Sequence, residues 1–79
     1  MEREIVIDKL TSIFKKVFGV DSLVLRNDLT ANDVDNWDSL THMLLITEIE
    51  NVFSIKFKLK DLNKMKNVGD MIEIIIFKL

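Results

Sequence analysis

The 79-residue sequence predicts a small, mainly helical domain, and three observations lead to this fold class. Apolar residues recur at helical spacing in three segments, 2–18, 39–53 and 67–79. Signals that start or stop helices stand at the borders of these segments. The length supports one hydrophobic core, and no internal boundary is visible, so we expect a single domain over residues 1–79.

The first segment is typical of an amphipathic helix that ends near residue 18. Two lysines, Lys15 and Lys16, stand in its last turn, where cations favour the helix dipole, and Gly19 follows as a stop signal. Its apolar residues at helical spacing are Val6, Leu10, Ile13, Phe14 and Val17.

Residues 19–37 form a long polar connection without sustained periodicity. Long ordered connections in small domains usually have a function or their own packing. Thr30 is a candidate cap for a short turn over residues 31–35. The apolar residues that could attach the connection to the core are Val20, Leu23, Leu25, Leu29 and Val34.

The second helix is predicted over residues 39–53 and has two apolar sides. The stripe that we expect to face the core, with His42 at its edge, consists of Leu45, Ile46, Ile49, Val52 and Phe53. Leu40, Met43 and Leu44 point to the opposite side, which an amphipathic helix normally keeps polar. We call these three residues the outward patch; an apolar surface at this position, beside Ser39, needs an explanation.

The last third of the chain gives mixed signals. Residues 55–60 read IKFKLK, and this alternation alone favours an edge strand. Asn67 is suited to cap a helix over 67–79, with Asp70 favouring its first turn. The run of isoleucines at 74–76 favours strand, but Val68, Met71, Ile72 and Ile75 keep helical spacing.

Composition excludes several classes of function. Without cysteine, and with His42 as the one histidine, a metal site would have to rest mainly on carboxylates and is not expected. No catalytic dyad can be assembled from the sequence, so an enzyme is not expected. Residues 1–53 carry a net charge of −5 and residues 54–79 a net charge of +3, and the acidic majority argues against nucleic-acid binding. No apolar run is long enough to span a bilayer and residues 1–10 do not resemble a signal peptide, so we expect a cytoplasmic protein without membrane insertion.

The tripeptide Asp-Ser-Leu occurs twice, at residues 21–23 and 38–40. Ser22 lies in the polar connection and is interpreted as an ordinary loop serine. Asp38 or Ser39 could simply cap the second helix. If Asp38 is the cap, however, Ser39 exposes its hydroxyl beside unpaired backbone N–H groups, where a phosphodiester would be favoured. A phosphate-linked group could also supply the thiol that this chain lacks.

These features together resemble the acyl carrier proteins of the free-standing type. The resemblance runs over nearly the whole chain: a first helix, a long loop, DSL at residues 38–40, and a second helix that ends in ENVF at 50–53. It continues in SIKF at 54–57, similar to the Phe-Gly-Ile-x-Phe pattern of many members, and in VGDM at 68–71.

The resemblance implies an all-α fold, a four-helix bundle with a long loop between helices 1 and 2 and a short third helix. It therefore replaces the strand at residues 55–60 by a loop and a short helix around 59–64. It implies 4′-phosphopantetheine on Ser39, attached from coenzyme A by a phosphopantetheinyl transferase, with Asp38 next to magnesium during loading. The reactive chemistry then belongs to the cofactor and to partner enzymes.

The resemblance also assigns a use to the outward patch: docking onto acyl-activating and acyl-transferring enzymes. The acids around it, Asp33, Asp35, Asp38 and Glu48, would meet basic partner surfaces. We expect a monomer with a role in lipid metabolism. Trp37 is expected to pack the loop onto the bundle, His42 to be a half-buried helix residue, and the lysines at 56–66 to form a solvated face.

Two departures from the family pattern point away from general fatty acid biosynthesis. Thr41 and Leu44 stand where many housekeeping members carry acids, and Trp37 replaces a small residue. The string WDSLTH at 37–42 is similar to carriers of specialised pathways, such as polysaccharide modification or secondary metabolism. An aminoacyl or peptidyl carrier, and an unmodified helical interaction module, remain alternatives. Met65 and Met71 could line a cavity for the acyl chain or could simply fill the core.

Overall fold

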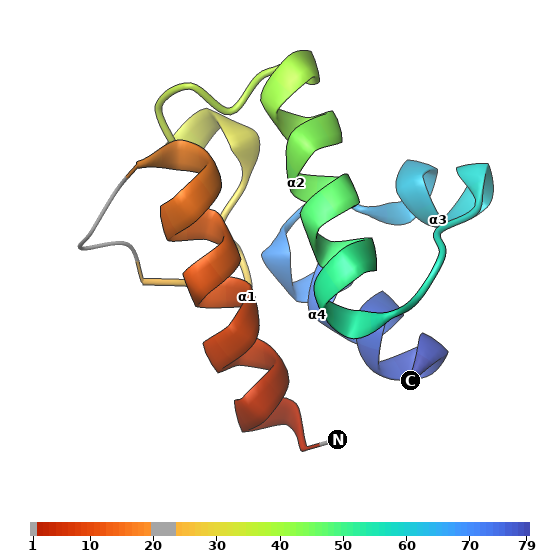
Figure 1. Cartoon of the computed structure of the whole chain (residues 1–79). Coiled ribbons are helices and arrows are strands. Elements are labelled where there is room, and N and C mark those ends of the chain that lie inside the picture. Colours follow the sequence, from red (N-terminus) through yellow and green to blue (C-terminus); the bar gives the residue numbers. More distant parts are fainter. Residues whose placement is uncertain (1, 20–23) are drawn as a thin grey trace.

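The computed structural model describes residues 2–19 and 24–79. Within these ranges the chain forms four α-helices and a short 3₁₀ helix, with no strand, so the predicted all-α four-helix fold is confirmed. α1 packs against α2 and α4, and the short α3 lies within the connection from α2 to α4 (Figure 1). The elements are α1 (Arg3–Phe18), η1 (Ala31–Asp33), α2 (Ser39–Phe53), α3 (Leu59–Lys64) and α4 (Val68–Lys78).

The ends of α1 and α4 follow the predicted signals. Gly19 adopts the left-handed conformation (φ 67°), and its N–H donates to the Lys15 carbonyl at 2.8 Å, which closes α1. Asn67 caps α4, because its Oδ1 accepts a hydrogen bond of 2.8 Å from the Asp70 N–H. Neither prediction required tertiary information.

The segment between α2 and α3 is extended, and its strand signal taken alone was wrong. Ile55 is buried and Phe57 packs against the core, while Lys56 and Lys58 are exposed, so the alternation reflects one buried side of a single extended segment. The Phe57 N–H donates to the Glu50 carboxylate at 2.8 Å rather than to a neighbouring strand. The loop and short helix implied by the resemblance are confirmed.

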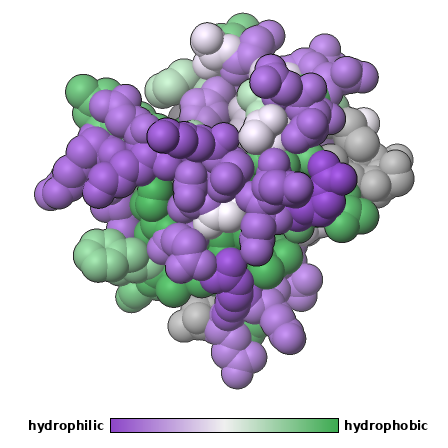
Figure 2. All heavy atoms as spheres, turned by 180° about the vertical axis from the view of Figure 1, so that it is seen from behind, coloured by the Kyte–Doolittle hydropathy of each residue, from purple (hydrophilic) through white to green (hydrophobic). Residues whose placement is uncertain are grey.

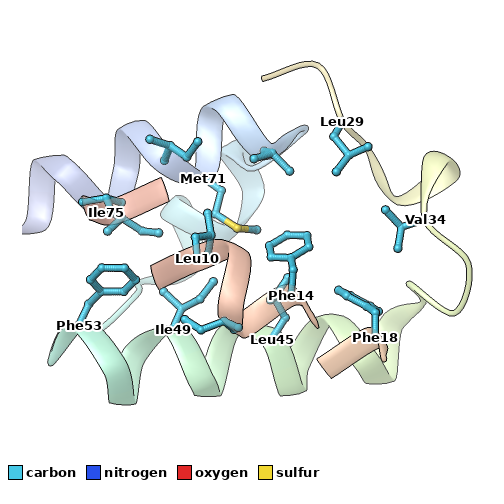
Figure 3. Close-up of a cluster of buried hydrophobic side chains, with 14 of the residues drawn as sticks. Leu10, Phe14, Phe18, Leu29, Val34, Leu45, Ile49, Phe53, Met71 and Ile75 are labelled. Atoms are coloured by element: carbon cyan, nitrogen blue, oxygen red, sulfur yellow. The ribbon is translucent and has the colours of Figure 1, made fainter. Parts of the chain in front are cut away.

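The core lies between α1, α2 and α4 (Figure 3). Leu10 and Phe14 of α1 pack between Leu45 and Ile49 of α2 on one side and Met71 of α4 on the other. The remaining buried apolar residues are Val6, Ile13, Phe18, Leu29, Val34, Ile46, Phe53, Ile55, Val68, Ile72 and Ile75. This core fixes the orientation of α2.

One residue of the predicted core stripe of α2 was placed wrongly. Val52 is 43% exposed, whereas Leu45, Ile46, Ile49 and Phe53 are buried. The buried arc of α2 is centred between Ile49 and Phe53, and Val52 falls about 75° away from that centre at 100° per residue. It lies at the rim, in a shallow groove lined by residues of α1.

The connection between α1 and α2 is attached to the body of the protein through side chains and backbone. Leu29 and Val34 are buried as predicted, Leu25 is half-buried, and Val20 and Leu23 lie outside the described residues. Thr30 precedes η1, and its N–H donates to the Asp33 carboxylate at 3.0 Å, so the predicted capped turn is present but shorter.

Two backbone hydrogen bonds join the same connection to the start of α4. The N–H groups of Val68 and Gly69 donate to the carbonyls of Leu29 and Asn27, each at 2.9 Å. A Cβ at Gly69 would lie 3.0 Å from the Asn27 carbonyl oxygen, so a side chain there would push the two segments apart. The connection that leads to α2 is therefore held against the start of α4.

Candidate functional site

The start of α2 is closed by a reciprocal capping arrangement. The Asp38 Oδ1 accepts a hydrogen bond of 3.0 Å from the Thr41 N–H, and the Thr41 Oγ1 accepts one of 2.8 Å from the Asp38 N–H. The Thr41 hydroxyl also donates to the Asn36 carbonyl at 2.6 Å. Thr41 thus fills the position that Glu or Gln takes in the usual capping box. Asp38, and not Ser39, is the cap.

Ser39 is therefore the first residue of α2. Its side chain is exposed, and its hydroxyl makes no hydrogen bond within residues 2–19 and 24–79. The N–H groups of a first helical turn carry a partial positive charge, which favours an anion. The Ser39 hydroxyl is accessible to an external reagent, in a position where an attached phosphate would be stabilised.

The serines described elsewhere have different settings. The Ser12 hydroxyl donates to the Asp8 carbonyl at 3.3 Å in the middle of α1. Ser54 follows α2 in the left-handed conformation (φ 56°) and ends that helix. Ser22, interpreted as a loop serine, lies outside the described residues.

Asp38 is ionised at neutral pH. The Thr41 backbone N–H lowers the pKa of the Asp38 carboxyl most, desolvation raises it, and the Thr41 hydroxyl lowers it further, so that the pKa lies below its usual value. Asp33 and Asp35 are also exposed nearby in the sequence. The described residues contain no group of three or more His, Cys, Asp or Glu side chains that could hold a metal ion.

Trp37 and His42 contact each other and line the same hollow as Ser39. The Trp37 ring packs against Phe14 and Phe18 at centroid distances of 5.3 and 5.5 Å, which confirms that it holds the loop on the bundle. The Trp37 Nε1–H donates to the His42 Nδ1 at 3.0 Å. Burial lowers the pKa of His42, and the hydrogen bond requires an unprotonated Nδ1.

His42 is half-buried, as predicted, and its ring stacks on Trp37. The sequence did not indicate its contact with Trp37. The two residues are five positions apart across a helix start, where no helical periodicity brings side chains together.

A hollow of about 370 Å³ opens beside Ser39, between the start of α2 and the segment from α3 to α4. Trp37, Met65 and Met71 contribute apolar walls, and Ser39 and Lys66 also line it. Both methionines lie where a cavity-lining role would place them, although Met71 is also part of the core.

The outward patch is exposed, as its phase on the helix predicts. Leu40 is 72% exposed, Met43 54% and Leu44 53%. Its acidic neighbours differ from one another: Asp35 is exposed and precedes α2, whereas Glu48 pairs with Lys16 at 3.1 Å. Glu48 lies about 13 Å further along the helix axis than Ser39, so the structure does not bring it next to the serine.

Comparisons with known proteins agree with this arrangement. The model of the family described as "Phosphopantetheine attachment site" matches residues 8–75. The acyl carrier protein of Coprothermobacter proteolyticus is 35% identical over 95% of this chain and 92% of its own length, and that of Thermotoga maritima is 32% identical over 98% and 95%. The solution structure of the holo acyl carrier protein from Geobacter metallireducens superimposes with a TM-score of 0.88 at 49% identity, covering 92% of this chain and 84% of that one.

The family match confirms the predicted cofactor, a phosphopantetheine prosthetic group. The structural match confirms the four-helix architecture. With the matched family model spanning all four helices, the chain belongs to the acyl carrier protein family.

Proposed function

We propose that Ser39 carries the 4′-phosphopantetheine and that the protein holds acyl groups as thioesters for partner enzymes. The observation that carries this proposal is the exposed Ser39 hydroxyl, without a hydrogen-bond partner in the described residues, on the first residue of α2. The prosthetic group supplies the thiol that this cysteine-free chain lacks. We infer that the chain acts as one acyl-carrier domain over residues 1–79 and is not itself an enzyme.

The loading reaction follows from the chemistry of coenzyme A. The Ser39 oxygen forms a bond to the phosphorus that bears pantetheine, the bond from that phosphorus to adenosine 3′,5′-bisphosphate breaks, and the serine proton passes to a base of the phosphopantetheinyl transferase. The new phosphodiester is an anion at a helix N-terminus, which favours it. The apolar walls of the neighbouring hollow offer a surface to the first part of the arm.

Asp38 is proposed to assist loading through its charge. Its carboxylate is exposed, it precedes the serine, and its lowered pKa keeps it ionised. A carboxylate in this position can attract the magnesium ion that the transferase uses. The capping hydrogen bond to Thr41 holds the carboxylate in one orientation.

The outward patch is proposed as the docking surface for acyl-activating and acyl-transferring enzymes. Leu40, Met43 and Leu44 expose large apolar groups on the first turns of the helix that begins at Ser39. Asp35 and Glu48 are proposed to meet basic partner surfaces, with Glu48 exchanging its Lys16 partner. A cytoplasmic location and a monomeric state remain predictions.

We further propose a specialised biosynthetic pathway rather than general fatty acid synthesis. Thr41 and Leu44 replace acids that many housekeeping members carry, and the Thr41 side chain is engaged in the helix cap. Docking at this patch would then depend more on apolar contact than on charge. The competing functions are an aminoacyl or peptidyl carrier and an unmodified interaction module.

The attachment site can be tested by intact-mass measurement after incubation with coenzyme A, magnesium and a broad-specificity phosphopantetheinyl transferase. Wild type and Ser22→Ala, whose serine lies in the same Asp-Ser-Leu tripeptide, should each gain one phosphopantetheine, and Ser39→Ala should gain none. Addition to Ser39→Ala would disprove the site, and no addition to wild type would favour the interaction module. The mass of the thioester released from natively produced protein then separates acyl from aminoacyl cargo.

A further inference from the structure

The side of the molecule formed by α3 and α4 exposes large apolar side chains that the acyl-carrier function does not explain. Phe77 is 88% exposed and Leu59 is 74% exposed, more than any residue of the outward patch. Leu79, at the end of α4, is also half-exposed. Part of the rear face shows apolar surface among hydrophilic surface (Figure 2). Large apolar side chains exposed to this degree on a small protein can mark a contact surface.

A groove of about 480 Å³ runs between the two helices at this side. Lys60 and Lys64 line it from α3, and Ile74 and Phe77 line it from α4. One wall is therefore apolar and aromatic and the other is basic.

The two acids at the groove are already neutralised. Asp61 pairs with Lys78 at 2.8 Å, and Glu73 pairs with Arg3. Lys60 and Lys64, in contrast, have no carboxylate partner within 4 Å in residues 2–19 and 24–79. The groove thus presents uncompensated positive charge, although the protein as a whole is acidic.

The basic character extends beyond the groove. Lys56, Lys58 and Lys66 are also exposed, and residues 54–79 carry a net charge of +3. We call Leu59, Lys60, Lys64 and Phe77 the basic-aromatic face.

We propose that the basic-aromatic face binds the surface of a membrane that contains anionic lipids, without crossing it. Exposed Phe and Leu side chains next to lysines are the combination that peripheral proteins use, since the apolar groups enter the interface while the ammonium groups stay among the headgroups. Phe77 lines the groove and, like Leu59, leaves most of its side chain exposed to solvent, where it can enter the interface of a bilayer. No helix in the described part of the chain is long and apolar enough to span a membrane.

The position of this face is compatible with the proposed carrier function. α2 begins at the upper end of the molecule in Figure 1, whereas α4 ends at the lower end. A protein bound near the end of α4 would have the start of α2, and with it Ser39, at the opposite end of the molecule. Membrane contact and partner docking could then occur together.

Vesicle sedimentation with the full-length chain tests this proposal. The protein should sediment with vesicles of phosphatidylcholine and phosphatidylserine at low salt, and not with vesicles of phosphatidylcholine alone or at high salt. Each lysine removed should weaken binding about five-fold, so Lys60→Gln/Lys64→Gln should lose roughly 25-fold. Phe77→Ala should lose roughly ten-fold.

The control variants carry the same changes elsewhere. Lys9→Gln/Lys15→Gln removes the same charge from α1, and Leu40→Ala truncates another exposed apolar residue. Both should bind as wild type does. The proposal is overturned if wild type does not bind the anionic vesicles, or if the control and test variants lose binding equally.

A soluble polyanion separates the membrane from an acidic protein partner. Poly-L-glutamate at matched charge should compete weakly with the vesicles, because it offers no apolar phase to Phe77. If poly-L-glutamate binds in a Phe77-dependent manner while vesicles do not, the face fits an acidic protein and the membrane proposal fails. Neither outcome involves Ser39, so the test of the attachment site stands apart from this one.

Discussion

Leu44 and Leu45 are adjacent leucines in α2 that the structure assigns to opposite surroundings. Leu44 is 53% exposed in the outward patch, and Leu45 is fully buried against α1. The same substitution, Leu→Ala, at the two positions therefore compares a surface role with a core role in one helix. It tests the phase of α2, on which the direction of the patch depends.

The expected magnitudes follow from burial. Leu45→Ala removes a completely buried side chain and should cost about 3 kcal/mol, within the usual range of about 2–5 kcal/mol for such truncations. A domain of this size has roughly 4–12 kcal/mol of net stability, so the loss is large and should lower Tm by roughly 12–24 °C. Leu44→Ala removes a side chain that is already half in water and should cost about 1 kcal/mol or less.

Urea unfolding followed by circular dichroism measures both values, with equal m-values as the check that the unfolded states match. Acyl transfer by a partner enzyme should respond in the reverse order. Leu44→Ala, and more strongly Leu44→Glu, should impair transfer while the melting temperature stays near that of wild type. A loss of stability in Leu44→Ala as large as that in Leu45→Ala would show that the helix is rotated and that the patch is core.

Four further variants test the site and the far end of α2. Because burial lowers the pKa of His42, the unfolded chain binds a proton more readily than the folded one. The free energy of unfolding should therefore fall as the pH drops below the ordinary histidine pKa of about 6.5. In urea titrations, His42→Gln should lose this pH dependence. Ser54→Gly should raise the free energy of unfolding by about 1 kcal/mol, since Ser54 occupies the left-handed conformation that glycine adopts without strain; an unchanged denaturation midpoint would contradict this. Asp38→Asn should keep the melting temperature of wild type, because the amide oxygen still accepts from the Thr41 N–H, but it should be loaded with phosphopantetheine more slowly. Asp38→Ala should have a lower melting temperature and slow loading, and the cap of the wild type should weaken as the pH falls through the lowered pKa of Asp38. Equal loading rates in wild type and both variants would refute the role of the charge.

Local signals were sufficient for the long helices. Gly19 and Asn67 act through their own backbone neighbours, so their effects could be predicted without the rest of the fold. α2 begins at Ser39 and ends at Phe53, as its periodicity indicates. Val52 shows the limit of periodicity, because its exposure depends on where the flank of α1 lies and not on its own phase alone.

Tertiary contacts decided what the pattern left open. The alternation at residues 55–60 could not distinguish an isolated extended segment from a strand, because the two differ only in whether a second strand pairs with the segment. Here the Glu50 carboxylate, and not a second strand, accepts the hydrogen bond from the Phe57 N–H. The short α3 was reached only through the family resemblance. The hydrogen bond between Trp37 and His42 depends on the packing of the loop against α1, which no local spacing encodes. At the candidate site, the sequence left the cap open between Asp38 and Ser39, with an exposed Ser39 hydroxyl expected if Asp38 is the cap, and it did not predict the contact between Trp37 and His42.

The backbone hydrogen bonds from Val68 and Gly69 to the connection have a mechanical consequence. They attach the connection that leads to Ser39 to the start of α4, although the two segments are far apart in the sequence. Hydrogen exchange at the Val68 and Gly69 amides would therefore report on the attachment of this connection as well as on the stability of α4. A substitution that unfolds the first turn of α4 would also release the connection that precedes Ser39.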